Sequence, residues 1–249
     1  MVEIFKLYCD DIITQSFKMN VLEETFEGIN LIGIKHGKHR GTSSDKLIIV
    51  AAHYDTVKES PGVEDNGSGV SAMLELLRVF SSRVNYSSNT VMFVAFDLEE
   101  EGCIGSFAFV KDFLLKEIEN IKFFGAVVLD MIMIFNNEPQ SQLFPDDIEK
   151  NNLPTIKIIE RDGFKGNFLS VIKRPKLDDF LWEKLKKSWS QIADKKYKLY
   201  SFDAPFSSNV KDEVIAKNEN FIRSDHATFW LYERILKSRS MPAIFVSDT

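Results

Sequence analysis

Three short runs of almost unbroken apolar residues constrain the fold of this chain more than any other feature. They read LIIVAA (47–52), TVMFVAF (90–96) and GAVVLDMIMIF (125–135). Strands this apolar are typical of a largely parallel sheet that helices cover on both faces. Amphipathic patterns with helical spacing occur at 69–84, 105–118, 177–193 and 225–236. This order predicts an α/β protein, a three-layer α/β/α sandwich with a mixed, largely parallel central sheet.

Length and composition favour a single domain over 1–249. The chain has 249 residues, 44% of them hydrophobic, which is enough for a substantial core. Residues 241–248 predict a last strand, and the chain is expected to start at or near a strand. The stretch 136–176, rich in Asn, Pro and Asp, is interpreted as loops beside the functional site.

Charge and cysteine content narrow the classes of partner. The net charge of −6 argues against nucleic acid or an anionic membrane as the main partner. The two cysteines, Cys9 and Cys103, give no disulfide framework and are interpreted as packing residues. No apolar run is long enough for a transmembrane helix, and the first residues do not resemble a signal peptide. As written, the chain is predicted to be cytoplasmic; if its N-terminus is truncated, the prediction is a secreted or membrane-associated protein.

Polar side chains gather where the three apolar runs end. His53 and Asp55 follow the first run, the segment DLEEEG (97–102) follows the second, and Asp130 lies within the third. In open α/β sheets, ligands bind at the carboxyl ends of the strands. A carboxylate inside an apolar run is costly to desolvate unless a cation or strong donors meet it.

Each of these residues alone has an ordinary structural explanation. His53 suits a buried structural histidine, Asp130 a loop cap or a partner for lysine, and the glutamates a solvated surface. Their convergence on one sheet edge favours a site for zinc or a similar divalent metal. Of the neighbours Glu99 and Glu100, one would ligate and the other would take a proton from the attacking water.

Five motifs in order resemble those of the co-catalytic zinc aminopeptidases. They read AHYD, PGVEDNGSGV, FVAFDLEEEGCIGS, VLDM and SDHATFW, and the resemblance extends from about residue 26 to residue 249. The superfamily also includes glutamate carboxypeptidases and glutaminyl cyclases. The resemblance implies two zinc ions, a peptide or aminoacyl substrate and hydrolysis of N-terminal peptide bonds.

The resemblance also assigns roles to individual residues. His53, Asp65, Glu100 and Asp130 would bind metal, with Asp65 bridging the two ions. Glu99 would be the general base, and Asp55 would orient the ring of His53. Asp225 and His226 would line the substrate pocket. Gly67 and Gly69 would let the chain turn tightly after Asp65 and begin a helix.

One departure from the family pattern affects the second zinc ion. The family's second histidine ligand follows the strand that resembles 241–248, whereas this sequence stops at Thr249. One ion would keep His53, Asp65 and Asp130, and the other only Asp65 and Glu100. The chain is therefore expected to be incomplete at its C-terminus, and truncation at its N-terminus is left open as well.

Two alternatives to an aminopeptidase remain open. One is a non-catalytic homologue or inactive fragment that acts as a binding domain. The other is a single-zinc acyltransferase of the glutaminyl cyclase type. The presence of four acids together, Asp65, Glu99, Glu100 and Asp130, favours the peptidase, because a binding module does not need them at one edge. The oligomeric state cannot be deduced from these residues.

Overall fold

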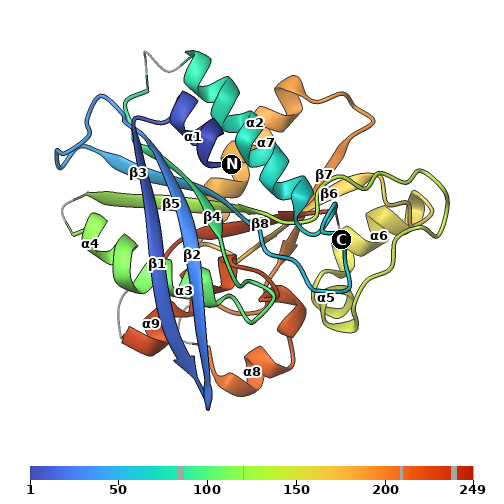
Figure 1. Cartoon of the computed structure of the whole chain (residues 1–249). Coiled ribbons are helices and arrows are strands. Elements are labelled where there is room, and N and C mark those ends of the chain that lie inside the picture. Colours follow the sequence, from blue (N-terminus) through green and yellow to red (C-terminus); the bar gives the residue numbers. More distant parts are fainter. Residues whose placement is uncertain (84–86, 120, 208–209, 237–239, 249) are drawn as a thin grey trace. The chain divides into compact units, whose positions relative to one another are not determined.

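The computed structural model describes residues 1–83, 87–119, 121–207, 210–236 and 240–248 (Figure 1). Its chain divides into two compact units, Met1–Leu129 and Asp130–Thr249. The organisation of 1–249 as a single domain stays a prediction. Among the described residues, no helix combines the length and apolarity that a membrane span requires. The cytoplasmic location also stays a prediction.

The first unit consists of strands that form a β-sheet and of helices that pack against it. Its elements are α1 (Val2–Tyr8), β1 (Asp11–Val21), β2 (Glu24–Lys35), β3 (Lys46–His53), α2 (Gly67–Arg83), β4 (Val91–Phe96), α3 (Ile104–Phe109), the π-helical turn η1 (Val110–Leu114), α4 (Leu115–Glu117) and β5 (Lys122–Leu129). Its strands lie in the order β1-β2-β4-β3-β5. β3 runs parallel to both of its neighbours, whereas the β1–β2 and β2–β4 pairs are antiparallel. The expected mixed sheet with parallel central strands is confirmed.

The register of this sheet brings three carboxyl ends together. His53, the last residue of β3, pairs with Phe96, the last residue of β4, and Ala51 pairs with Val128 near the end of β5. Residues that follow these strands therefore emerge at one edge of the sheet, as the sequence predicted.

Helices cover both faces of the first unit's sheet. A Cβ on Gly33 of β2 would lie 3.0 Å from the ring of Phe5 in α1, so this residue faces α1. Asn30 of β2 faces the other way, and its Nδ2 donates to the carbonyl of Gly105 in α3 at 2.8 Å. Helix α2 packs against α1 and against β3, β4 and β5. The layered α/β arrangement expected from the apolar runs is confirmed.

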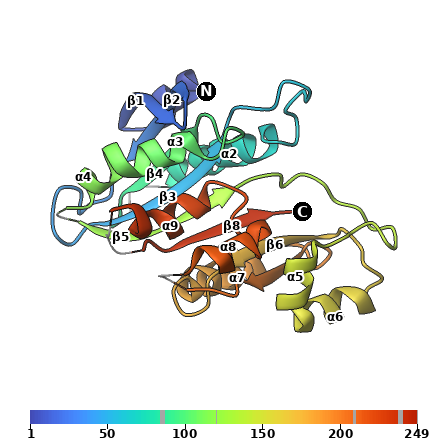
Figure 2. The ribbon, with the colours of Figure 1, turned by 90° about the horizontal axis from the view of Figure 1, so that it is seen from below.

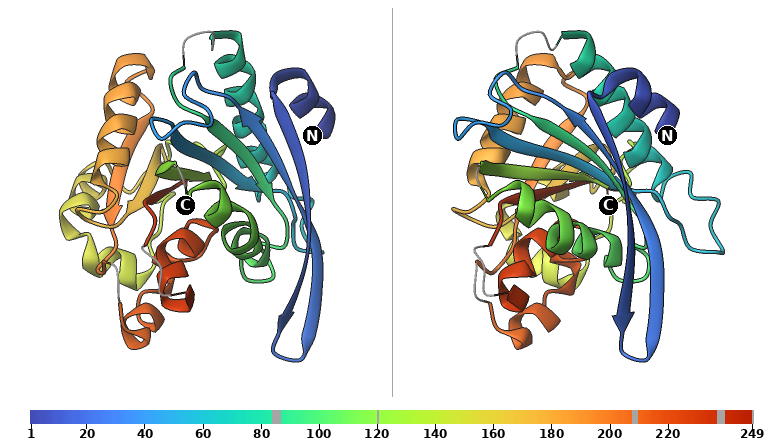
Figure 3. Two further views of the ribbon diagram at one scale, coloured as in Figure 1. Left: turned by 90° about the vertical axis from the view of Figure 1, so that its left-hand side faces the viewer. Right: turned by 60° about the vertical axis from the view of Figure 1, so that its left-hand side comes forward.

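The β1–β2 hairpin extends beyond the rest of the first unit's sheet (Figure 3). The two strands pair along their whole length, up to Val21 opposite Glu24, but β2 pairs with β4 only over 31–35. Within the described ranges, the outer part of the hairpin is therefore a two-stranded ribbon with no third strand beside it.

The second unit also consists of paired strands and helices. Its elements are α5 (Asp146–Asn151), α6 (Leu153–Arg161), β6 (Phe168–Lys173), α7 (Asp179–Ile192), β7 (Lys198–Asp203), α8 (Asp212–Ala216), the 3-10 turn η2 (Glu219–Phe221), α9 (His226–Leu236) and β8 (Ala243–Ser247). β6 lies between its two partners, parallel to β7 and antiparallel to β8. Helices α5 and α6 lie side by side, as Figure 2 shows.

Three sequence expectations were wrong. The stretch 136–176 is not all loop, because it contains α5, α6 and β6. The chain begins with helix α1 rather than a strand, since Phe5 is buried against the sheet. The run 125–135 does not continue as a strand past Leu129, because Met131 has a left-handed backbone with φ of 53°. Asp130 therefore follows β5 directly instead of lying inside it. Residue 84, the end of the helix predicted at 69–84, lies outside the described residues.

Candidate metal centre

The site is built around His53, whose side chain is 1% exposed at the end of β3. Its Nδ1 lies 3.2 Å from the backbone oxygen of Asp55 and 3.4 Å from the Oδ1 of the same residue. These contacts turn Nε2 toward Asp65, whose Oδ1 is 3.1 Å away. A ring held through one nitrogen presents the other in a fixed direction, which is the arrangement of metal-binding histidines.

Asp55 also holds the turn that carries the two glutamates. Its carboxylate accepts the backbone N–H groups of Glu99 and Glu100, each at 3.1 Å. Burial acts to raise the pKa of Asp55, but hydrogen bonds from His53 and from these two N–H groups bring the pKa below its ordinary value. Asp55 therefore stays ionised while it orients both the histidine and the turn.

The turn after β4 is tightly closed. Leu98 and Cys103 have positive φ angles of 55° and 60°, and the N–H groups of Gly102 and Cys103 both donate to the carbonyl of Glu99 at 2.8 Å. The side chain of Glu99 is buried, and the thiol of Cys103 lies 3.7 Å from its Oε1. This turn fixes the backbone of Glu99, the candidate general base.

Asn66 anchors the loop that carries Asp65, a role that the sequence analysis did not assign. Its Nδ2 donates to the carbonyl of Leu129 at the end of β5, at 2.9 Å, and its Oδ1 accepts the N–H of Gly69 at 3.0 Å. The position of an asparagine between Asp65 and a glycine-rich helix start is the signal that could have identified it. Asn66 thus ties Asp65 to the same sheet edge as the other acids.

The glycines after Asp65 are needed because other atoms lie very close to their Cα atoms, and not because the backbone turns there. Gly67 and Gly69 already lie in α2. A Cβ on Gly69 would be 2.5 Å from the carbonyl oxygen of Leu129 and 2.3 Å from Oδ1 of Asn66, and one on Gly67 would be 2.6 Å from the carbonyl oxygen of Gly62. Only glycine leaves room for these contacts.

Substituting Gly69 by alanine is expected to lower the free energy of unfolding by about 1 to 3 kcal/mol, because the added methyl group would push α2 away from β5. Urea unfolding measures this change. The matched control is Ser71→Ala, an exposed position in the same helix, which should change stability by less than about 0.5 kcal/mol. Equal stabilities of the two variants would contradict the close approach.

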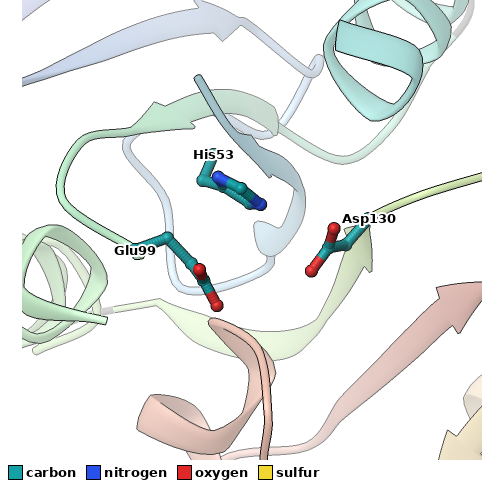
Figure 4. Close-up of side chains that lie close together, drawn as sticks. All are labelled: His53, Glu99 and Asp130. Atoms are coloured by element: carbon teal, nitrogen blue, oxygen red, sulfur yellow. The ribbon is translucent and has the colours of Figure 1, made fainter. Parts of the chain in front are cut away.

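The sequence-predicted metal residues of the first unit come together. His53, Asp65 and Glu100 each offer one ligand atom within 4.8 Å of the others. Asp130, directly after β5, offers a carboxylate oxygen within the same limit of His53 and Glu99, and Figure 4 shows these three side chains close together. One imidazole with several carboxylates is a ligand set that zinc accepts.

Two buried oxygens in this cluster indicate that it is built for a cation. Among the described residues, Oε1 of Glu100 is buried and makes no hydrogen bond, and Oδ1 of Asp65 is buried with the ring nitrogen Nε2 of His53 3.1 Å away. Burial first, and then the charge of Asp65, raise the pKa of Glu100. A buried carboxylate oxygen without a donor is costly, and a bound cation would satisfy it while also contacting Asp65.

Asp225 and His226 are both fully buried in the second unit. Nε2 of His226 donates to the carbonyl of Phe221 at 2.8 Å, and the ring stacks on Phe245 with centroids 4.7 Å apart. Burial lowers the pKa of His226 to about 3. Their assignment to a substrate pocket stays a prediction. His36 pairs with Asp11 on the surface and is absent from both described ligand clusters.

His226 is expected to make the protein less stable in acid. The pKa of His226 is about 3 in the folded protein and 6.5 in the unfolded chain, so between these pH values the unfolded chain binds a proton that the folded protein does not. The free energy of unfolding therefore decreases as the pH is lowered. From pH 7 to pH 5 the contribution is about 2 kcal/mol. Urea unfolding at both pH values measures it. His226→Gln removes the titrating group and should reduce the loss by that amount; an unchanged loss would exclude His226 as its cause.

Comparisons with known proteins agree with this geometry. Residues 30–161 match peptidase family M28. Over 90 residues the chain is 43% identical to aminopeptidase YwaD of Bacillus subtilis, a match that covers 36% of this chain and 19% of YwaD.

Solved structures show the same fold. The zinc aminopeptidase BSAP from Bacillus subtilis aligns with a TM-score of 0.55 and 24% identity, over 90% of this chain and 41% of that one. A glutaminyl cyclase from an Acidobacteriales bacterium aligns with a TM-score of 0.59 and 15% identity, over 98% of this chain and 67% of that one. The expected superfamily and zinc aminopeptidase-like fold are confirmed, although this chain spans less than half of BSAP.

The matched stretch begins at Asn30 in β2 and ends at Arg161 in α6, so it contains all the residues of both candidate ligand clusters. This chain belongs to peptidase family M28.

Proposed function

We propose that this chain carries the zinc-dependent centre of an aminopeptidase. The observation that supports it most is the cluster of His53, Asp65 and Glu100, in which a buried carboxylate oxygen of Glu100 makes no hydrogen bond among the described residues. YwaD is an aminopeptidase and BSAP is a zinc aminopeptidase. Because the match covers only 19% of YwaD, aminopeptidase activity is proposed for this chain and does not follow from the match alone.

Two zinc ions are proposed, with unequal ligand sets. As the family resemblance implies, His53, Asp65 and Asp130 would hold one ion, and Asp65 and Glu100 the other, with Asp65 contributing to both. The ligand atoms in the structure group differently, with Glu100 beside His53 and Asp65, and Asp130 beside His53 and Glu99. When bound, zinc lowers the pKa of water and polarises a carbonyl group. The first ion would be held more tightly, because the second set contains no nitrogen ligand among these residues.

The protein's own residues would handle the proton. Glu99 lies beside the cluster on a backbone that the turn and Asp55 hold in place. A carboxylate there would accept a proton from the attacking water and deliver it to the leaving amine. Asp55 would keep the ring of His53 in one tautomer.

The proposed substrate is a peptide or aminoacyl compound with a free amino terminus. Asp225 and His226 would line its pocket, as the family resemblance suggests. With its pKa near 3, His226 would be a neutral ring at physiological pH, and its Nε2 donates to Phe221. Nδ1 would therefore be an acceptor rather than a cation.

The deciding experiment compares two reporter substrates, an aminoacyl anilide and its N-acetylated form, with zinc added or removed by a chelator. An aminopeptidase cleaves the first, spares the second and loses activity with the chelator. Cleavage of the acetylated substrate would contradict the requirement for a free amino terminus.

The two alternatives give different results in the same assay. A glutaminyl cyclase-type enzyme would release ammonia from a peptide with N-terminal glutamine and cleave no peptide bond. Only a likeness of fold supports it, at 15% identity. A binding domain would take up zinc without turnover of either substrate.

Replacing Asp55 by asparagine is expected to weaken zinc binding by about 10- to 100-fold without loss of the fold, because the histidine ligand loses the charge that orients it. Competition with a fluorescent chelator measures the affinity, and circular dichroism reports the fold. The control is Asp112→Asn, an exposed carboxylate of the same unit that should bind zinc like the unaltered protein. Equal zinc affinity of both variants would contradict the orienting role.

A further inference from the structure

The tip of the β1–β2 hairpin presents a leucine surrounded by acids. Leu22 is 99% exposed, and Val21 beside it is also exposed. Glu23 and Glu24 follow, both exposed, and neither forms an ion pair within the part of the chain that the structure describes. We name Val21–Glu24 the acidic knob. A two-stranded ribbon with no third strand is marginally stable in water, so an apolar tip gains from a partner.

A complementary surface lies in the second unit. A groove of about 280 Å³ has a mainly apolar lining, formed by Ile132, Met133, Ile134, Phe135, Phe168, Leu169, Trp189 and Tyr197, with Asn167 and Lys198. Met133, Ile134 and Phe135 are 59%, 54% and 45% exposed. A contiguous apolar patch of this kind is typical of an interaction site.

Lysines border this groove. Lys198 is part of its lining, with its Nζ paired to Asp162. Nζ of Lys196 lies 4.8 Å from the centroid of the Tyr197 ring, which also lines the groove. The segment 184–198 contains six lysines and a single acid, Asp194, in a chain of net charge −6. We name this surface the basic groove. Its apolar floor and positive border match the apolar centre and negative border of the acidic knob.

We propose that the acidic knob of one copy docks in the basic groove of a second copy of this chain. Leu22 would enter the apolar lining, while Glu23 and Glu24 would face Lys195 and Lys196. The knob and the groove are different surfaces, so the contact is heterologous and can add further copies head to tail. A hairpin tip buries little area, and the dissociation constant is expected to be roughly 10 to 100 µM.

Sedimentation over a concentration series tests the contact with the chain as it exists. The average mass should rise with concentration and should rise less at about 0.5 M salt, which screens the charges. Leu22→Asp should weaken association about tenfold or more. Leu7→Asp removes another exposed leucine, in α1, and should leave association unchanged. A chain that stays monomeric throughout, or equal association of both variants, would overturn the proposal.

Mixing two defective variants gives the sharper test. Leu22→Asp has no knob but an intact groove, whereas the double variant Lys195→Glu with Lys196→Glu has an intact knob and a defective groove. Each alone should be largely monomeric, and the mixture should form a one-to-one complex that does not grow further. Lys157→Glu with Lys211→Glu, both exposed, makes the same charge change away from the groove lining and should not abolish growth. A mixture that remains monomeric, or loss of growth in the control, would refute docking of knob in groove.

Discussion

Glu99→Gln is expected to lower the hydrolysis of aminoacyl substrates by about 100-fold or more while fold and bound zinc are retained. Glutamine has nearly the same shape as glutamate but cannot accept the proton from water. The backbone contacts that hold this turn, from Gly102 and Cys103 to the carbonyl of Glu99, do not involve the side chain and would persist. Steady-state kinetics with saturating zinc, together with elemental analysis for the metal, separate the loss of the base from the loss of zinc.

Glu101→Gln is the matched control, since Glu101 adjoins the same turn but is exposed. It should retain the activity of the unaltered protein. If Glu99→Gln kept most of its activity and Glu100→Gln lost it with zinc still bound, the roles of base and ligand would be reversed.

His53→Ala is expected to weaken binding of the tighter zinc ion by more than about 100-fold, the upper end of what removal of an orienting partner costs. The imidazole supplies the nitrogen ligand of the cluster. It is buried, and neither described cluster contains another histidine that could replace it. Isothermal titration with zinc at fixed pH measures the change, and zinc should raise the melting temperature of the unaltered protein more than that of the variant.

His36→Ala provides the comparison, because His36 pairs with Asp11 on the surface and takes part in neither described cluster. Its zinc affinity should equal that of the unaltered protein. A stoichiometry near two that His53→Ala leaves unchanged would show that the zinc ions bind elsewhere.

The parts of the fold that could be predicted are the strands whose burial shows in their apolar composition. β3 and β4 are apolar along nearly their whole length because the sheet is covered on both faces, and the register at His53 and Phe96 follows from parallel pairing. β7, with the sequence KLYSFD, was missed because most of it is only partly buried and it has no continuous apolar run. β6 was hidden in a stretch whose Asn, Pro and Asp residues resemble loop composition.

The site could be predicted in its residue types but less well in its geometry. His53, Asp65 and Glu100 were named from motifs, and the structure places their ligand atoms together. The contacts of Asn66 and the reason for Gly69 depend on the carbonyl of Leu129, which is 63 residues from Asn66 in the sequence, and no local pattern reveals such a contact.

The wide turn η1 has a consequence for the evolution of this sequence. A π-helical turn is typically an α-helix with one residue inserted, which the helix absorbs locally without rotating the residues on either side. Here Phe109 and Leu114 stay buried while Lys111 and Asp112 bulge into solvent. Relatives that lack the insertion should therefore show a one-residue gap inside this helix, around 110–114, instead of in a loop.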